Sequence, residues 1–377
     1  MDACDVLIVG GGPAGSSCAW ELRRSGLETI ILDKQTFPRD KICGGWITPA
    51  VLDALEIDRN EYASSRTLQR ITGFRTSRMG GREVETTYAE PISYGIRRCE
   101  FDNYLLRLSG ARIYEGVVLA NLERVSDHWV VNGQIKAKVV VGAGGHFCPV
   151  ARFLGAEARK EVAVVAQETE FELSSQQRKE CSIRGEFPEL FFCSDMKGYG
   201  WCFRKGDFLN IGMGRLDAHA LPQHVSSFIQ FLKDSRKLGV DVPTSLHGHA
   251  YLLYRHHQRD VVGDGILLVG DSAGLAYSQS GEGIRPAVES GLLAADVILS
   301  ARGEYNQTTL SPYGSMLTSQ FGKVHDDWSV VIGRCIPARW ISSFSKLLLE
   351  SRWFSRHVVL DRWFLHRDDP ALRPIAH

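Results

Sequence analysis

The sequence predicts an α/β fold in which a parallel sheet is interleaved with a mostly antiparallel sheet and followed by a helical C-terminal region. An apolar run, a glycine-rich turn and a helical pattern follow one another at the start of the chain. Two more apolar runs that end in glycine lie far downstream, and alternating polar and apolar residues fill much of the space between them. The 377 residues also exceed the roughly 250 to 300 at which one core stops growing.

The parallel sheet is predicted from separate segments of the chain. Short continuous apolar runs that lead into glycine are typical of interior strands of a parallel sheet. The first two strands flank a turn and a helix, which together form one βαβ unit. The predicted elements are a strand at 5–9, a turn at 10–15, a helix at 16–24, and strands at 28–32, 137–141 and 266–269.

Strand-like alternation predicts the second, mostly antiparallel sheet. A helix at 221–237 is expected to cover one edge of it, and from about residue 310 the apolar spacing is helical. The alternating segments are 71–77, 83–88, 162–172, 182–187 and 198–213. We therefore expect a discontinuous first domain (1–75, 98–160 and 255–309), a β domain (76–97 and 161–254) and a helical C-terminal region (310–377).

Composition narrows the classes of function. Lys plus Arg and Asp plus Glu both number 44, and this neutrality argues against a nucleic-acid partner. The nine cysteines include no CxxC pair, so we predict no metal site. No leader-like segment and no apolar run of spanning length is present. We expect a cytoplasmic protein, either freely soluble or peripheral to a membrane.

The glycine-rich turn predicts dinucleotide binding by a Rossmann-type domain. Gly10 allows the tight turn, Gly12 lets the backbone approach a pyrophosphate, and Gly15 permits close helix packing. Asp33 ends the second strand, where a carboxylate can accept the hydroxyls of a ribose. A glycine-rich turn alone is a weak signal, but this one lies between a predicted strand and a predicted helix.

A second nucleotide-type element follows the last predicted strand. In residues 265–274 the strand ends at Gly270, and Asp271 precedes a helix start of small residues. Asp271 can accept a hydroxyl hydrogen bond there, or it can simply cap the helix. The glycines of residues 280–283 would let the backbone pass close to a flat ring system, although glycines also serve plain turns.

Six segments in order resemble those of the geranylgeranyl reductase family, within the para-hydroxybenzoate-hydroxylase-like group of FAD enzymes. The resemblance covers roughly residues 4 to 300. The segments are GGGPAG (10–15), FPRDKICGG (37–45), RCEFDNYL (98–105), VVGAGG (140–145), GYGWCFRKGD (198–207), and GDSAG (270–274) with SGEGI (280–284).

The resemblance implies non-covalently bound FAD. It would place Asp33 at the adenosine ribose, Arg98 at the phosphates or ribityl chain, and Asp271 at the ribityl chain. The backbone at residues 281–283 would lie beside the isoalloxazine ring. The predicted cofactor-binding residues are Gly10, Gly12, Pro13, Ala14, Gly15, Asp33, Lys34, Cys43, Gly44, Arg98, Gly142, Gly270, Asp271, Gly281, Gly283 and Ile284.

The resemblance also implies that Tyr199, Trp201 and Phe203 line a substrate pocket over the flavin. Their period of two is equally typical of the buried face of a strand, and both interpretations can hold together. Cys43 would lie near flavin and substrate and could assist proton delivery or control access, or it could be a small buried hydrophobe. Cys43, Tyr199 and Trp201 are the candidate catalytic residues.

One departure from the larger group concerns the reductant. Gly144 stands where an Asp is usual, and that Asp often interacts with both FAD and NAD(P)H. No second GxGxxG is present. We therefore expect either transient docking of NAD(P)H or a protein electron donor. His256 and His257 could suggest a proton relay, but adjacent residues on an extended segment face opposite ways.

The C-terminal region combines aromatic and basic residues, which allows two interpretations. The rings could enter a membrane interface while the basic groups meet anionic lipid, or an aromatic face could cover the core or a dimer partner. The oligomeric state stays open. The residues concerned are Trp328, Trp340, Phe344, Leu347, Leu348, Trp353, Phe354, Trp363 and Phe364, with Arg334, Arg339, Lys346, Arg352, Arg356 and Arg362.

The predicted function is FAD-dependent reduction of carbon–carbon double bonds in an isoprenoid or other small hydrophobic substrate. Two alternatives stay open, because one fold supports several chemistries. The first is a monooxygenase that hydroxylates an aromatic or polyketide-like molecule. The second is a flavin-binding protein without turnover. Gly144 is the residue that leaves this alternative open, because it stands where an Asp is usual in the larger group. A halogenase fits less well, because residues 200–205 lack the WxWxIP pattern.

Overall fold

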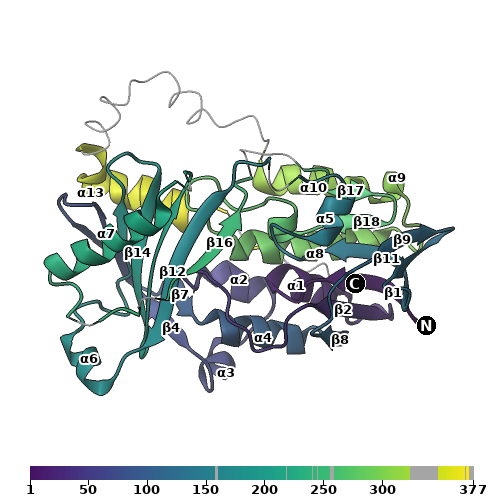
Figure 1. Ribbon diagram of the computed structural model, residues 1–377, viewed down its shortest axis with the longest axis horizontal. Helices are drawn as coiled ribbons and strands as arrows, with labels where there is room; N and C mark the ends of the chain where they lie inside the picture. The colour runs from purple at the N-terminus through teal and green to yellow at the C-terminus, as the bar shows by residue number, and fades with distance from the viewer. Residues whose placement is uncertain are drawn as a thin grey trace.

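The computed structural model describes residues 1–157, 160–217, 219–239, 241–243, 245–254, 259–322, 347–369 and 371–372. The molecule is elongated (Figure 1). A mostly parallel sheet with its helices forms one end, and a large antiparallel sheet forms the other. Helices α2 and α4 run along the part between them.

The first sheet has the strand order β17-β18-β11-β1-β2-β8, and β10 and β9 extend it antiparallel from β11. The predicted fold class is confirmed, because β1, β2, β8, β11 and β18 are parallel. The strands are β1 (Asp2–Val9), β2 (Thr29–Asp33), β8 (Arg112–Glu115), β9 (Leu122–Val125), β10 (His128–Val131), β11 (Ile135–Gly142), β17 (Val262–Gly263) and β18 (Ile266–Leu268).

Apolar side chains bury both faces of this sheet, as expected for interior parallel strands. Leu7, Ile8 and Val140 are fully buried. Helix α1 (Pro13–Leu22) packs closely on α8 (Ile284–Ser300). A Cβ on Gly291 would lie 2.3 Å from the carbonyl oxygen of Ala14, so only glycine allows this approach.

The second sheet has the order β16-β12-β15-β14-β13-β5-β6, and only the β13–β5 pair is parallel. A third, three-stranded sheet has the order β3-β7-β4. The seven strands are β5 (Gly73–Arg78), β6 (Val84–Thr87), β12 (Val164–Glu172), β13 (Glu189–Phe192), β14 (Gly198–Lys205), β15 (Phe208–Arg215) and β16 (His247–Tyr251). The third sheet contains β3 (Trp46–Ile47), β4 (Leu68–Ile71) and β7 (Ser93–Ile96).

Three of the predicted strands are wrong in detail. Segment 198–213 is a hairpin, because a turn at 206–207 separates β14 from β15. Segment 71–77 is divided at Thr72, so that β4 and β5 belong to different sheets. Segment 182–187 is not a strand. Its alternation reflects burial of Ile183 beneath α7 (Leu221–Asp234), while the Glu186 carbonyl accepts bonds from the amides of Thr72 and Gly73.

Helix α7 covers a face of the second sheet rather than its edge. Val225, Phe228 and Leu232 are fully buried against side chains of β13, β14 and β15. The remaining helices are α2 (Pro49–Ala54), α3 (Arg59–Ala63), α4 (Arg98–Leu108), α5 (Pro149–Phe153), α6 (Ser175–Glu180), α9 (Gln307–Leu310), α10 (Pro312–Phe321) and α13 (Arg352–Phe354), with a short turn η1 (Gly270–Ser272).

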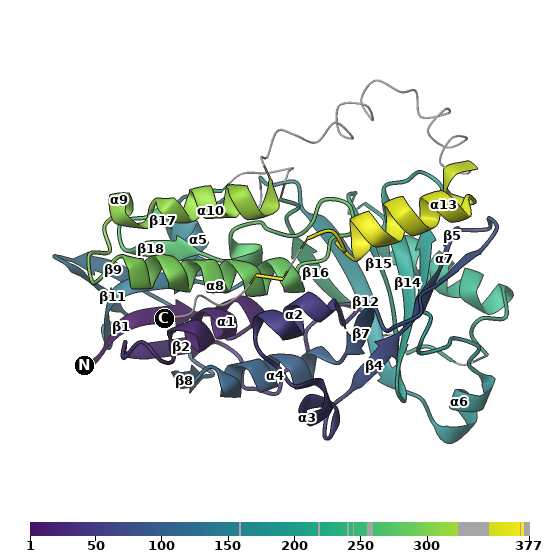
Figure 2. The same ribbon diagram turned by 180° about the vertical axis from the view of Figure 1, so that it is seen from behind.

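The π-helical segment η2 (Ser355–Phe364) follows α13 and lies along the second sheet (Figure 2). Val359, Leu360 and Phe364 are fully buried in the same cluster as Trp46 and Trp201. These C-terminal residues therefore act as a cap on the core. Trp328, Trp340, Phe344, Arg334, Arg339 and Lys346 lie outside the described residues. Within the described part of the chain, no helix combines the length and apolar character needed to cross a bilayer.

Candidate active site

A cavity of about 870 Å³ extends from the glycine-rich turn after β1 to the aromatic residues of β14. It has the size typical of a cofactor or ligand site. Residues from both sheets line it. Among the predicted site residues, those that line the cavity are Gly10, Gly12, Pro13, Ala14, Asp33, Lys34, Cys43, Gly44, Arg98, Tyr199, Trp201, Phe203, Asp271, Gly281, Gly283 and Ile284.

Three predicted cofactor-binding glycines are not among the lining residues, and each has a packing role. A Cβ on Gly15 would lie 2.0 Å from the Gly10 carbonyl oxygen, which agrees with close helix packing. A Cβ on Gly142 would lie 2.6 Å from a Leu268 methyl carbon. Gly270 has φ +58° and lies against Ala14. The segment just after Gly142, residues 143–145, lines the cavity instead.

The turn after β1 forms one end of the cavity. Gly10 has φ +118°, and a Cβ there would lie 2.3 Å from the Ala143 carbonyl oxygen. Helix α1 begins directly afterwards with Gly12 as its N-cap, so its first N–H groups are free to meet an anion. Asp33 at the end of β2 is mostly buried, and its Oδ2 accepts a 2.7 Å hydrogen bond from the Gly11 amide.

Two arginines share one buried carboxylate at this end. Arg98 binds Asp102 through two hydrogen bonds of 2.7 Å, and Nη2 of Arg39 lies 3.1 Å from the same carboxylate. Asp102 is fully buried. Nη1 of Arg39 is buried without a hydrogen-bond partner among the described residues, and a Cβ on Gly12 would lie 3.4 Å from Nη2. Arg39 therefore has an unused donor close to the N-terminus of α1.

A second cluster lies farther along the cavity, where Lys41, His249 and Asp271 meet. Nζ of Lys41 lies 3.0 Å from Nδ1 of His249, and Nε2 of His249 lies 3.3 Å from Oδ2 of Asp271. Burial lowers the pKa of Lys41 to about 8, against the opposing effect of Asp271. Burial alone would raise the pKa of Asp271, but His249 and Lys41 hold it below its usual value.

These groups fit FAD. The unused Arg39 donor and the N-terminus of α1 suit a pyrophosphate, and Asp33 suits a ribose. Asp271 and Arg98 both line the same cavity, where they could meet the phosphates or the ribityl chain. Gly281 has φ +68°, and a Cβ there would lie 2.4 Å from the Tyr251 hydroxyl, so only glycine fits at this point of the cavity wall.

Aromatic residues of β14 form the other end. Trp201 and Phe203 are 7% and 4% exposed, and the Tyr199 hydroxyl donates to the carbonyl of Ser280. Nε1 of Trp201 donates to Oδ1 of Asn210 at 2.7 Å. The Phe364 ring packs against Tyr199 with a centroid distance of 5.3 Å, so η2 closes this end. Burial raises the pKa of Tyr199 well above its usual value, which keeps its hydroxyl protonated.

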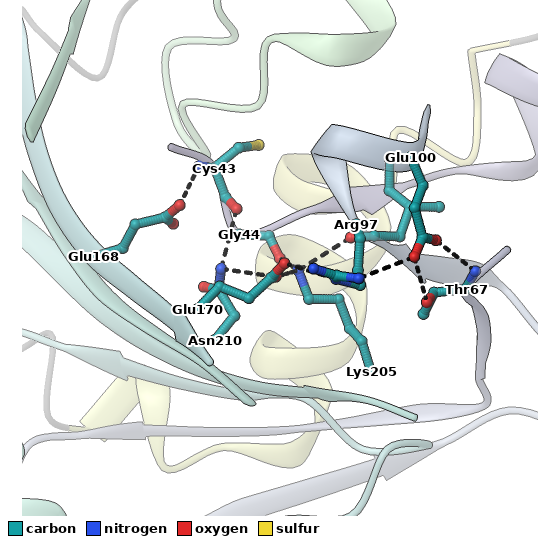
Figure 3. A network of polar contacts seen from close by, with 10 residues as sticks. Cys43, Gly44, Thr67, Arg97, Glu100, Glu168, Glu170, Lys205 and Asn210 are labelled. Atoms are coloured by element: carbon teal, nitrogen blue, oxygen red, sulfur yellow. Dashed lines mark hydrogen bonds and ion pairs between the residues drawn. The ribbon is translucent and has the colours of Figure 1, made fainter. Parts of the chain in front are cut away.

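The backbone of residues 43–45, here called the CGG segment, meets a network of polar side chains on the second sheet (Figure 3). On its other side, a Cβ on Gly44 would lie 3.1 Å from the Phe203 ring. The Cys43 amide donates to Glu168, and the Cys43 carbonyl accepts a 3.3 Å hydrogen bond from Asn210. The Gly44 carbonyl accepts a 3.0 Å hydrogen bond from Nζ of Lys205. Burial would lower the pKa of Arg98, but Asp102 and then the Cys43 thiol raise it, so the thiol lies beside Arg98.

Sequence reasoning missed Arg39, Lys41, Glu168 and His249. Arg39 and Lys41 lie inside the FPRDKICGG segment, which was singled out for Cys43. His249 alternates with Tyr251 on β16, and that period of two could have predicted a shared face. His256 and His257 lie outside the described residues.

Gly144 also lines the cavity. A Cβ there would lie 3.2 Å from the Cys148 sulfur, so a side chain at this position requires the neighbour to shift. A buried ion pair between Arg259 and Glu161 lies beside His146, because Arg259 donates to the carbonyl of His146 at 3.1 Å.

Comparisons with known proteins agree with this site. A family model described as FAD dependent oxidoreductase matches residues 5–98. A menaquinone reductase of Mycobacterium tuberculosis is 29% identical over 79% of this chain and 77% of its own length. Digeranylgeranylglycerophospholipid reductase 3 of Methanosphaera stadtmanae is 28% identical over 85% of this chain and 83% of its own length.

Solved structures agree in fold. A geranylgeranyl bacteriochlorophyll reductase-like protein of Thermoplasma acidophilum superposes with a TM-score of 0.80 at 19% identity, covering 98% of both chains. A halogenase solved with FAD gives a TM-score of 0.68 at 18% identity, covering 97% of this chain and 85% of its own. The chain is therefore an FAD-dependent oxidoreductase that resembles the geranylgeranyl reductases, as the sequence predicts.

Proposed function

We propose that this protein reduces carbon–carbon double bonds of an isoprenoid or other hydrophobic substrate. Bound FAD would supply the hydride, as flavins do in such reactions. The observation that carries the proposal is that a single cavity joins the glycine-rich cradle to the aromatic end formed by β14. Two of the relatives are named as a menaquinone reductase and a digeranylgeranylglycerophospholipid reductase, and these names support a lipid substrate.

The aromatic end would bind and orient the apolar chain. Tyr199, Trp201 and Phe203 offer large rings with few unpaired polar atoms, because the Tyr199 hydroxyl and the Trp201 N–H are both engaged. Phe364 and Trp46 stack at 5.6 Å and close the far side. Exclusion of water from this end would strengthen polar interactions at the reacting carbons.

Reduction of an alkene also needs a proton at the second carbon, and Cys43 is the group that we propose holds it. Its side chain lines the cavity next to Arg98. The Tyr199 hydroxyl is occupied with the Ser280 carbonyl, so a positioning role suits Tyr199 better.

The reductant is proposed to be either NAD(P)H that docks transiently or a protein electron donor. Gly144 at the cavity wall lacks the carboxylate that would otherwise be available there.

The test is an anaerobic reoxidation experiment. The holoprotein is reduced chemically and mixed with lipids that carry a geranylgeranyl chain or its saturated counterpart, and flavin absorbance is followed. Only the unsaturated lipid is expected to restore the oxidised spectrum without oxygen. Reoxidation that strictly requires oxygen would favour the monooxygenase alternative, and a protein that no donor reduces would favour flavin binding without turnover.

We also propose peripheral membrane contact through the C-terminal region. Leu347 and Trp353 are 72% and 66% exposed, and Arg352 beside them is exposed as well. Such groups suit the interface of an anionic bilayer. Co-sedimentation with anionic vesicles should fall several-fold in Trp353→Ala. Phe153→Ala, which removes a 50% exposed ring on α5, is the control. Equal binding of both variants would contradict this contact.

A further inference from the structure

Three side chains of the second sheet hold the CGG segment by its backbone (Figure 3). Glu168 of β12 accepts from the Cys43 amide, Asn210 of β15 donates to the Cys43 carbonyl, and Lys205 of β14 donates to the Gly44 carbonyl. Every one of these side chains is at least 95% buried. Buried polar side chains thus hold residues 43 and 44 at the cavity wall, while the Gly45 carbonyl accepts a 2.7 Å backbone bond from the Ile96 amide of β7.

The fit leaves little room for the segment to move sideways. A Cβ on Gly44 would lie 3.1 Å from the Phe203 ring, and a Cβ on Gly45 would lie 2.4 Å from Nζ of Lys205. On the sheet side, a Cβ on Gly212 would lie 2.3 Å from the Trp201 ring and 2.7 Å from Cβ of Glu168. The carboxyl group of Glu168 is therefore confined between the sheet and the CGG segment.

Glu168 differs from its two partners in its charge balance. Lys205 forms an ion pair with Glu170 on the neighbouring part of β12, whereas Glu168 forms no salt bridge with any described residue. Oε2 of Glu168 is buried and accepts no hydrogen bond from the described residues. Burial raises the pKa of Glu168 to about 7, and the negative charge of Glu170 adds to this effect.

The other groups near Glu168 either lower its pKa or have exposed side chains. The Cys43 amide, the Lys205 ammonium and the Asn210 amide each favour the ionised carboxyl. His247 of β16 lies opposite Glu168 in the strand register, but its side chain is exposed. A buried carboxyl in these surroundings exchanges a proton more readily near neutral pH than an ordinary glutamate does.

We propose that Glu168 is a positioning residue whose carboxylate holds the CGG segment at the cavity wall, and that protonation of this carboxyl loosens the hold. The inference deepens the proposed function, because the CGG segment carries the Cys43 thiol into the cavity. A hydrogen bond to a charged acceptor is stronger than one to a neutral acceptor. Raising the pH through neutrality therefore tightens the segment.

Hydrogen exchange of the Cys43 amide tests this directly, in holoprotein without substrate or reductant. Glu168→Gln keeps an acceptor oxygen but has no charge. At about pH 8.5 the Cys43 amide should exchange about tenfold faster in Glu168→Gln than in wild type, which is the difference between a charged and a neutral acceptor. At about pH 5.5 the two rates should be nearly equal, since the wild-type carboxyl is then protonated. The ratio cancels the intrinsic pH dependence of exchange.

Glu172→Gln is the matched control, because Glu172 lies on the same strand but is exposed. It should leave the Cys43 exchange rate unchanged at both pH values. A ratio that does not vary with pH, or a rate in Glu168→Gln that equals wild type at high pH, would overturn the proposal. If Glu168→Gln does not fold, the protection of Cys43 in wild type must still rise through pH ~7, while that of Ile47, held in β3, must not.

This readout is independent of catalysis. Failure to reduce any double bond would contradict the proposed function, but it would not affect the interpretation of the hydrogen-exchange result. In an active enzyme, the same ionisation should appear in the pH profile of kcat for wild type and for Glu168→Asp, which retains a carboxyl, and vanish in Glu168→Gln.

Discussion

The two faces of the second sheet use the same strands for different purposes. On β15, Leu209, Ile211 and Met213 face α7 and are buried among apolar side chains. The residues between them, Asn210 and Gly212, face the cavity side with Glu168 and Trp201. One face is a plain hydrophobic core, and the other contains charges, glycines and tightly placed aromatic rings.

This difference indicates where the protein gives up stability for function. The α7 face gains free energy from apolar burial at little polar cost. The cavity face buries Glu168 and Lys205 and partly buries Glu170, and burial of charges usually costs more than a well-packed apolar group would. The predictions below ask whether the two faces respond differently to substitution.

The largest effect is expected on the α7 face. Phe228 is fully buried, and its ring packs against Phe191 at a centroid distance of 5.5 Å. Phe228→Ala should lower the free energy of unfolding by about 3–5 kcal/mol, because a cavity remains. Denaturant titration measures this, with the exposed Ser227→Ala as control. The FAD content per folded chain should not change. A folded variant without bound FAD would contradict the claim that the two faces have separate roles.

On the cavity face, substitution of Glu168 should raise the free energy of unfolding, whereas substitution of Phe228 lowers it. Its folded-state pKa of about 7 lies above the ordinary 4.5, so wild type loses stability as pH rises from about 4.5 to 7. Glu168→Gln avoids that loss. Its free energy of unfolding should therefore exceed that of wild type by roughly 2–4 kcal/mol at about pH 8.5. At about pH 4 the two free energies should be equal. A Glu168→Gln variant that is less stable than wild type at about pH 8.5 would contradict this prediction.

Arg39 tests the cradle end of the cavity. Its Nη1 has no partner among the described residues, and its charge lies beside the start of α1. Arg39→Gln should raise the Kd for FAD about 10- to 100-fold, which is the range expected for charge-assisted hydrogen bonds. Titration of apoprotein with FAD measures it. Arg24→Gln, at the far end of α1 and exposed, should bind as wild type does.

The smallest effect is expected for Trp201→Phe. The substitution keeps the apolar ring but removes the N–H donor to Asn210. Asn210 still binds the Cys43 carbonyl and Glu170, so the loss should be about 1 kcal/mol of stability and a few-fold in kcat/KM. A loss as large as that of Phe228→Ala would mean that the two faces do not differ in kind.

Local patterns in the sequence were enough to predict the main strands of the parallel sheet. The apolar runs that end in glycine predicted β1, β11 and β18 because interior parallel strands are buried on both faces. Segment 182–187 misled because burial of Ile183 under α7 produced alternation without a ladder. The sequence pattern therefore reported burial correctly but not hydrogen-bond pairing.

The site was less predictable, because it depends on contacts between distant segments. Glu168 and Cys43 are separated by 125 positions, and His249 meets Asp271 and Lys41 only after the second sheet is complete. The glycine turn and Asp33 could be found because their spacing is local. The roles of Cys43, Tyr199 and Trp201 stay predictions.

The most direct test of the proposed function is the mass of the product after one anaerobic turnover. Reduced holoprotein is mixed with a limiting amount of a lipid that carries a geranylgeranyl chain, and the lipid is extracted and weighed by mass spectrometry. The account predicts a product heavier by two hydrogens. An unchanged lipid beside fully reduced, folded protein, or a product that gains one oxygen once air is admitted, would contradict it.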